Sequence, residues 1–168
     1  MDKVHFSRCL RFSYPDKLFT FNYLYDEEKD SFVPDKSHVT GTPSHNANFR
    51  YWDVTVSLLP HLRQRCSHLL DKFELSGNPS ITDEFLNALV SHFPHLSYLT
   101  ISDCSSISLR GIQTLLQLTS LTHLHVGGLS CINDDCISML TDYLTSLQDL
   151  DISRCGNVSN AALVTLAG

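Results

Sequence analysis

The chain has 168 residues, of which 42% are hydrophobic and 18% are charged, and this composition indicates a folded domain with its own core. The formal net charge of −6 does not favour nucleic acid or an acidic membrane as the main partner. No stretch approaches the roughly 18 uninterrupted apolar residues of a membrane-spanning helix, and residues 1–10 lack the apolar core of a signal peptide. We therefore expect a cytoplasmic protein, with a nuclear location as the alternative, that is not secreted.

Residues 1–50 are rich in aromatic and turn-forming residues and show no sustained hydrophobic period. Within them, residues 34–48 combine Pro, Gly, Asn and Ser in a pattern that is typical of a linker or a long loop. We predict that residues 1–50 form an irregular segment or a cap. Just after it, the only tryptophan, Trp52, is expected to pack over the exposed edge of the following region together with Tyr51, Val54 and Val56.

Residues 51–168 contain a repeat, which is visible in two apolar positions that recur at a nearly fixed spacing. The first position recurs at intervals of 26, 25 and 26 residues, at Leu75, Ile101, Val126 and Ile152. The second position follows the first by the same distance in every repeat, at Ile81, Ile107, Ile132 and Val158. A period of this length is typical of the leucine-rich class of repeats.

Each repeat divides into a strand, a turn and a helix. Two apolar residues separated by one other residue predict a short strand with one buried face, and these pairs are Phe73 and Leu75, Leu99 and Ile101, Leu124 and Val126, and Leu150 and Ile152. Residues that cap helix N-termini well follow the turns, at Thr82, Ser108, Asn133 and Ser159. The pattern predicts an α/β leucine-rich-repeat solenoid, with parallel strands on a concave face and helices on a convex face, because a single repeat cannot bury its apolar side alone.

We expect about four repeats in a domain spanning residues 51–168, truncated at the C-terminus, since Gly168 falls inside the expected helix of the fourth repeat. Residues 96–108 and 147–159 follow the pattern L-x-x-L-x-I-S-x-C-x-x-I-S, with Val158 at the last apolar position. This pattern resembles the cysteine-containing leucine-rich repeat of F-box/leucine-rich-repeat proteins, and the resemblance covers roughly residues 62–168. It implies substrate recognition for an SCF-type ubiquitin ligase, with a Skp1-type adaptor as a partner.

An F-box begins with a Leu-Pro pair and an apolar helix. The pair in this sequence, Leu59-Pro60, is expected in a helix that leads directly into the first repeat. The resemblance to F-box/leucine-rich-repeat proteins therefore rests on the repeats, and these residues do not supply an F-box of that kind.

The six cysteines are expected to be free thiols in a reducing compartment, because no secretory signal accompanies them. Cys104 and Cys155 follow the strands of their repeats, where the resemblance implies a buried side chain that meets the loop backbone. Asn78 and Leu129 occupy this position in the other two repeats. A second position takes small residues, and we expect the helix to approach the strands there, at Gly111, Cys136 and Ala162.

Alternation along the strands places a stripe of polar side chains on the concave face, opposite the buried residues. We predict that this stripe binds another protein, with Tyr98 and Arg154 as anchors, because Tyr and Arg dominate many protein interfaces. The alternative is that the stripe is only the solvated face of the sheet. The predicted binding residues are Lys72, Glu74, Tyr98, Thr100, Asp103, His123, His125, Asp149, Asp151 and Arg154, and Ser76, Ser102 and Ser153 lie on the same stripe.

Two histidines and two aspartates form a square within this stripe. His123 and His125 belong to one strand, and Asp149 and Asp151 occupy the same two positions on the next strand. Such a set could bind a divalent metal ion. We favour an ion-paired contact surface that holds no metal, whose binding would change with pH near neutrality because histidine titrates there.

Motifs of catalysis are missing from the sequence, which contains no GxSxG, no phosphate-binding glycine loop and no HExxH. We therefore predict a protein-binding module that is not an enzyme and uses no cofactor. The alternative function is that of a structural subunit or assembly factor in a large multiprotein complex, a role that repeat proteins of this class also have in ciliary and mitochondrial assemblies.

Overall fold

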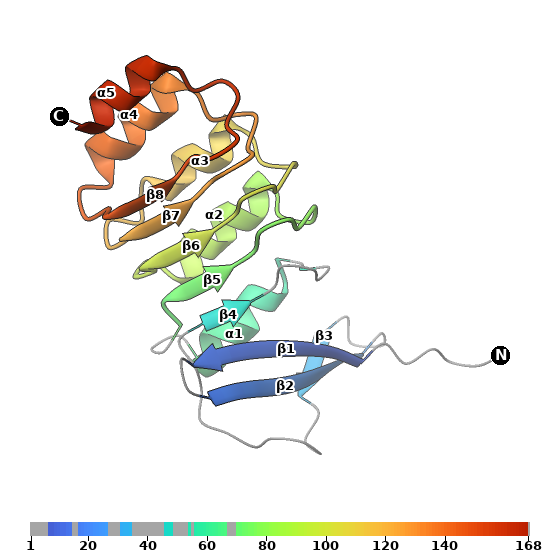
Figure 1. Cartoon of the computed structure of the whole chain (residues 1–168). Helices are drawn as coiled ribbons and strands as arrows, with labels where there is room; N and C mark the ends of the chain where they lie inside the picture. The colour runs from blue at the N-terminus through green and yellow to red at the C-terminus, as the bar shows by residue number, and fades with distance from the viewer. Residues whose placement is uncertain are drawn as a thin grey trace.

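The computed structural model describes residues 7–14, 17–26, 31–34, 46–48, 54, 56–66 and 70–167, the first four of these segments as backbone only. The described strands form one sheet in the order β3-β2-β1-β4-β5-β6-β7-β8 (Figure 1). Its antiparallel part consists of β1 (Ser7–Tyr14), β2 (Lys17–Asp26) and β3 (Ser31–Pro34). Its parallel part consists of β4 (Asn46–Asn48), β5 (Lys72–Glu74), β6 (Tyr98–Thr100), β7 (His123–His125) and β8 (Asp149–Asp151). The strand β4 joins the two parts, because it pairs antiparallel with β1 and parallel with β5.

One helix follows each parallel strand, and the helices lie along one side of the sheet (Figure 1). They are α1 (Leu58–Cys66), α2 (Asp83–His92), α3 (Leu109–Leu115), α4 (Asp134–Tyr143) and α5 (Asn160–Ala167). A continuous apolar core runs from Val54 to Ala162. None of the helices among the described residues combines the length and the apolar character that a membrane span requires. This α/β arrangement of parallel strands and helices is compatible with the predicted leucine-rich-repeat fold.

The predicted alignment of the strands is confirmed. Phe73 lies beside Leu99, Leu99 beside Leu124, and Leu124 beside Leu150 in the parallel pairings of β5 to β8. Phe73, Leu99 and Leu124 are completely buried. Since side chains alternate along a strand, the residues on either side of each buried one point to the opposite face of the sheet.

The four predicted helix caps are also confirmed. Each cap side chain accepts a hydrogen bond from a backbone N–H in the first turn of its helix, and these N–H groups have no partner within the helix itself. The pairs are Thr82 with Phe85, Ser108 with Arg110, Asn133 with Cys136, and Ser159 with Ala161. Two caps are also tied to the helix of the preceding repeat, because Ser108 donates two hydrogen bonds to Asp83 and Ser159 donates two to Asp134.

The prediction that residues 1–50 are irregular is wrong for the described part of that segment. The strands β1 and β2 pair from Ser7 with Leu24 to Tyr14 with Lys17. The sequence of β2 alternates strictly, with Phe19, Phe21, Tyr23 and Tyr25 at every second position. Aromatic residues at this spacing favour a strand, and their short period is distinct from the long repeat period of residues 51–168.

The predicted linker at residues 34–48 contains β4, a fifth parallel strand. Asn46 pairs with Lys72, which follows it by 26 residues, so that β4 and α1 extend the repeat spacing towards the N-terminus. The Asn-Ala-Asn sequence of β4 lacks the two apolar residues that mark the other strands. The predicted packing of Trp52 and Tyr51 lies outside the described residues, whereas Val54 is buried in the core and Val56 packs against it.

The predicted packing roles of Cys104 and Cys155 are confirmed. Both thiols are buried, and both donate to a backbone carbonyl oxygen of the preceding repeat, Cys104 to Leu75 at 3.2 Å and Cys155 to Val126 at 3.4 Å. Burial raises the pKa of both thiols, which keeps them protonated at neutral pH. These cysteines therefore link neighbouring repeats through their backbone.

The small-residue position on the helices is buried, but its neighbours differ from the prediction. A Cβ on Gly111 would lie 2.4 Å from a carboxylate oxygen of Asp83 and 3.1 Å from a side-chain carbon of Leu86. Both neighbours belong to α2. At Gly111 the small residue therefore allows close approach of the preceding helix.

Candidate protein-binding surface

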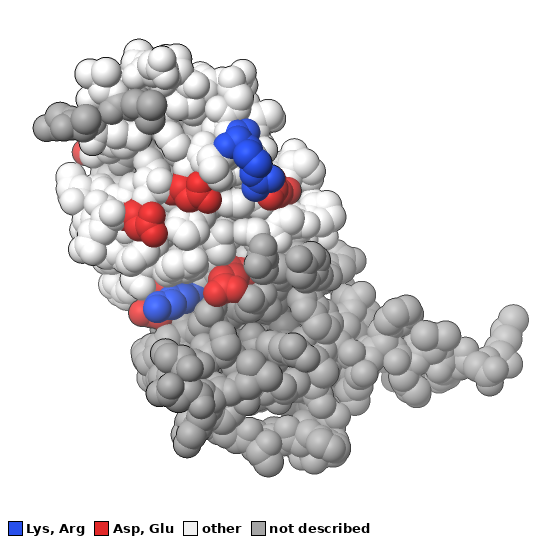
Figure 2. Space-filling view, viewed as in Figure 1, with Lys and Arg blue, Asp and Glu red and all other residues white. Residues whose placement is uncertain are grey.

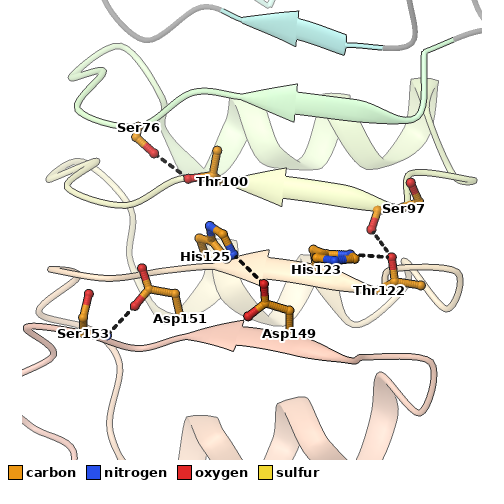
Figure 3. A network of polar contacts seen from close by, with 9 residues as sticks. All are labelled: Ser76, Ser97, Thr100, Thr122, His123, His125, Asp149, Asp151 and Ser153. Carbon is orange, nitrogen blue, oxygen red and sulfur yellow. Dashed lines mark hydrogen bonds and ion pairs between the residues drawn. The ribbon is translucent and has the colours of Figure 1, made fainter. Parts of the chain in front are cut away.

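Two rows of polar side chains cross strands β5 to β8 on the face of the sheet that points away from the helices. We refer to these residues as the polar face. Figure 3 shows the members of these rows on β7 and β8, together with Thr100 of β6. Figure 2 shows that charged side chains are few on this side of the molecule, where most of the described surface is uncharged. The first row is Lys72, Tyr98, His123 and Asp149, and the second is Glu74, Thr100, His125 and Asp151. The structure thus brings together all the predicted binding residues except Asp103 and Arg154, which lie in turns after β6 and β8.

Tyr98 occupies the centre of the polar face. Its ring centroid lies 5.6 Å from that of His123 and 5.4 Å from that of His125, the second contact being edge-on. On the other side, the Lys72 ammonium lies 6.0 Å from the Tyr98 ring centroid. These distances are typical of aromatic packing and of the outer limit of cation–π contact. The three rings therefore form a partly exposed aromatic platform across β6 and β7.

The hydroxyl of Thr122 contacts both the neighbouring repeat and the ring of His123. The Thr122 hydroxyl donates to the backbone carbonyl oxygen of Ser97 at 2.9 Å, and it also lies 2.9 Å from His123 Nδ1 (Figure 3). Since a hydroxyl has one hydrogen to donate, Nδ1 is the donor in the second bond when that hydrogen is used on Ser97. In the neutral ring, Nε2 of His123 is then a hydrogen-bond acceptor. No feature of the repeat pattern indicates this role for Thr122.

The two aspartates of β8 have different surroundings. Asp149 Oδ2 lies 3.3 Å from His125 Nε2, and the Asp149 side chain is 54% exposed. Asp151 Oδ1 accepts a hydrogen bond from the Ser153 backbone N–H at 2.8 Å. Hydrogen bonds from the Ser153 hydroxyl and N–H lower the pKa of Asp151, with a smaller contribution from the charges of His125 and Arg154. Asp151 is therefore an anion at neutral pH.

Thr100 is less accessible than the prediction of an exposed stripe requires. Only 8% of its surface is exposed, and its hydroxyl shares a hydrogen bond of 2.5 Å with the hydroxyl of Ser76 (Figure 3). Ser76 and Ser102 are buried as well. Thr100 lies in register between Glu74 and His125, whose larger side chains flank it. The end of the polar face near these three hydroxyls is thus largely closed to a partner.

The turn after each of the strands β5 to β8 contains one residue with a left-handed backbone conformation. Its φ is between 59° and 74° at equivalent positions of four repeats: Gly77, Asp103, Gly128 and Arg154. The N–H of this residue donates to a carbonyl oxygen of the next repeat in the first three cases. Sequence reasoning missed this shared conformation, because two of the four residues are not glycine.

The side chains of Asp103 and Arg154 meet across the repeat that lies between them. Arg154 Nη2 donates to Asp103 Oδ2 at 2.7 Å. The position between them belongs to Gly128, and a Cβ there would lie 2.2 Å from Asp103 Oδ1. The missing side chain of Gly128 therefore leaves the space in which the ion pair forms. Because both partners are exposed, the pair contributes little to stability.

The square of His123, His125, Asp149 and Asp151 exists in the structure, since the two pairs are in register on β7 and β8. Among the residues that the structure describes, however, no group of three or more His, Cys, Asp or Glu side chains is arranged to hold a metal ion. The alternative of a metal site on the polar face therefore gains no support from this part of the chain.

Known proteins include a relative of part of this chain. No family model matches the chain. The chain is similar to the F-box/LRR-repeat protein 12 of Arabidopsis thaliana, with 31% identity over 111 residues. The match covers 63% of this chain but 27% of that relative. The likeness supports a relation to leucine-rich-repeat and F-box proteins, while this chain spans only part of the relative's length.

Proposed function

We propose that residues 70–167 form a leucine-rich-repeat solenoid that binds another protein through the polar face. The observation that carries this proposal is the strand register, which places an aromatic residue, two imidazoles and both signs of charge side by side on one open sheet face. Protein interfaces depend on a few such anchors surrounded by weaker polar contacts. The relative with leucine-rich repeats gives independent support for a role in protein interaction.

The charged state of the Asp151 carboxylate on the polar face fits a binding role better than a catalytic one. A general acid needs a raised pKa, whereas the pKa of Asp151 is lowered by hydrogen bonds from Ser153. We therefore propose that the chain is not an enzyme.

The biological setting that we propose is substrate recognition for an SCF-type ubiquitin ligase, in the cytoplasm or nucleus. The support is the cysteine-containing repeat pattern and the likeness to an F-box/LRR-repeat protein. In this setting the full-length protein co-purifies with a Skp1-type adaptor. Purification without such an adaptor, under conditions that retain other partners, would contradict it.

A role as a structural subunit or assembly factor is the second candidate, and apolar residues exposed on α5 and near β8 are the surface that it would use. Val164 of α5 is 74% exposed, Leu166 is also exposed, and Leu150 and Ile152 of the β8 region are only partly buried. A partner that packs end-on against these apolar residues would use the repeats as a rigid spacer. The two candidates differ in which surface the partner contacts.

Site-specific photo-crosslinking separates these surfaces. A photoreactive phenylalanine analogue is placed at Tyr98 on the polar face, at Val164 on α5, or at Tyr143, which is 61% exposed on α4. We expect a partner adduct from position 98 and none from positions 143 and 164. The proposal fails if position 98 gives no adduct, and an adduct from position 164 alone would favour the structural role.

The substitution Tyr98→Ala should then weaken binding of the crosslinked partner. Removal of a central aromatic anchor costs about 2 kcal/mol, or roughly thirtyfold in Kd. Because Tyr98 is only partly buried, the melting temperature of this variant should stay close to that of the parent. Isothermal titration calorimetry with the purified partner measures the effect, and Tyr143→Ala serves as the control with unchanged affinity.

A further inference from the structure

The polar face carries more hydrogen-bond acceptors than donors at its β8 side. Asp149 and Asp151 project from the same side of one strand, since they are two residues apart. His123 adds Nε2 as an acceptor in the neutral tautomer whose Nδ1 donates to Thr122. A ligand of this region must therefore bring donors and positive charge.

The basic side chains of the described surface do not meet this demand. The guanidinium of Arg154 is engaged with Asp103, on the far side of Gly128. Lys72 lies on β5, three strands away from β8, where its ammonium approaches the Tyr98 ring. His125 gives Asp149 one contact at 3.3 Å, which leaves most of that carboxylate open to solvent. Among the described residues, the Asp149 carboxylate is thus open to a partner, and Asp151 lies beside it with hydrogen bonds from Ser153.

The aromatic platform next to these carboxylates indicates which kind of positively charged group the partner brings. The rings of Tyr98, His123 and His125 lie on β6 and β7, and adjacent strands are about 4.8 Å apart. A planar guanidinium can rest on an aromatic ring while its N–H groups point to a carboxylate. A lysine ammonium matches the charge but offers neither a planar face nor a paired set of donors.

We propose that the polar face takes an extended, arginine-containing segment of a partner protein, with the guanidinium between the β8 aspartates and the aromatic platform. This inference rests on the proposed function of the polar face as a protein-binding surface. A segment that crosses from β6 to β8 covers about 10 Å, which corresponds to roughly three extended residues. The arginine occupies one end of this stretch, and a neighbouring residue packs on Tyr98.

Random peptides displayed on phage can test the proposal, because their selection requires no identified partner. The full chain is compared with the double variant Asp149→Asn/Asp151→Asn and with the control Asp135→Asn/Asp142→Asn, which changes the charge equally at exposed positions of α4. The parent and the control should enrich arginine-containing peptides, and the β8 double variant should lose this enrichment. Circular dichroism checks that all three proteins are equally folded.

A chemical substitution in the selected peptide tests the guanidinium on the parent protein alone. Replacement of its arginine by citrulline keeps the length and removes the charge, and should weaken binding at least about tenfold. Replacement by lysine should give an intermediate loss. Peptides whose binding depends on Tyr98 but shows no preference for arginine would overturn this inference and leave the proposed function standing. Failure to select any peptide that depends on Tyr98 would overturn both.

Discussion

The repeats of β5 and β8 lie at opposite ends of the array of parallel strands β5 to β8. They carry the same apolar pattern, but their apolar residues differ in burial. At the β5 end, Phe73, Leu75 and Ile81 are completely buried. At the β8 end, the equivalent residues Leu150, Ile152 and Val158 are partly exposed. The difference follows the neighbours, because β4 covers the outer edge of β5, whereas none of the described strands pairs with the outer edge of β8 (Figure 1).

The difference in burial indicates that a repeat of this kind has no core of its own. Its apolar residues leave water only where another strand and helix lie against them, so burial is a property of pairs of repeats. Hydrophobic stabilisation scales with the apolar area removed from water. The same leucine should therefore contribute more in the middle of the array than at the β8 end.

The substitution Leu124→Ala should have the largest effect on stability, and Leu150→Ala gives the matched comparison. Leu124 is completely buried, so its truncation should cost about 2–5 kcal/mol. Leu150 keeps part of its surface in water, and its truncation should cost roughly half as much. Urea unfolding followed by circular dichroism measures both values. Equal losses would mean that the β8 end is covered in solution.

A second comparison concerns two turns, of which the turn at Gly128 is closely packed. The substitution Gly128→Ala should cause a smaller loss of stability than Leu124→Ala. Alanine at this position would keep a φ of 74° that disfavours a side chain, and its Cβ would collide with the Asp103 carboxylate. We expect a loss of about 1–3 kcal/mol. In the next turn, Gly156 has open space around its Cα, so Gly156→Ala should stay within about 0.5 kcal/mol of the parent. A loss for Gly156→Ala as large as that for Gly128→Ala would remove the distinction between the two turns.

The repetitive part of the fold was predictable because its signals are local in sequence. The buried alternation that marks Leu124 and the capping residues such as Asn133 depend on side-chain size and chemistry alone. The strand β4 carries neither signal, since Asn-Ala-Asn has no apolar pair, and only its distance of 26 residues from Lys72 indicates it. The antiparallel strands β1 and β2 lie outside the repeats, and the alternation of aromatic residues in β2 is a signal of a different and shorter period.

The residues that lie on the polar face were predictable, whereas their exposure and their hydrogen bonds were not. Alternation alone placed Tyr98 and His125 on one face. The burial of Thr100 depends on the side chains of the two neighbouring strands, and the ion pair of Asp103 and Arg154 depends on a backbone conformation shared across repeats. Such properties arise from contacts between residues that are a repeat or more apart, and they have no signature in a single repeat.

The smallest predicted effect concerns the hydrogen bonds between the repeat of β8 and the repeat before it. It is a change of melting temperature at acidic pH. Ser159 donates to Asp134 through its backbone N–H at 2.7 Å and its hydroxyl at 2.5 Å, and these bonds lower the pKa of Asp134. A carboxyl whose pKa is lower in the folded chain stabilises the fold above its unfolded pKa of about 3.9, and this contribution is lost as the pH falls through the folded pKa. The substitution Ser159→Ala should therefore flatten the fall of melting temperature below about pH 4.

The informative quantity is the slope of melting temperature against pH. Ser159 also caps α5, so its loss lowers the melting temperature at every pH. Ser106→Ala is the control, since the Ser106 hydroxyl donates to the carbonyl oxygen of Pro79, which does not titrate. Melting followed by circular dichroism between about pH 3 and pH 7 should give parallel curves for the control and the parent. If Ser159→Ala also runs parallel to them, Asp134 does not hold the last repeat in the way the hydrogen bonds indicate. The contrast between the two ends of the array would then rest on apolar burial alone.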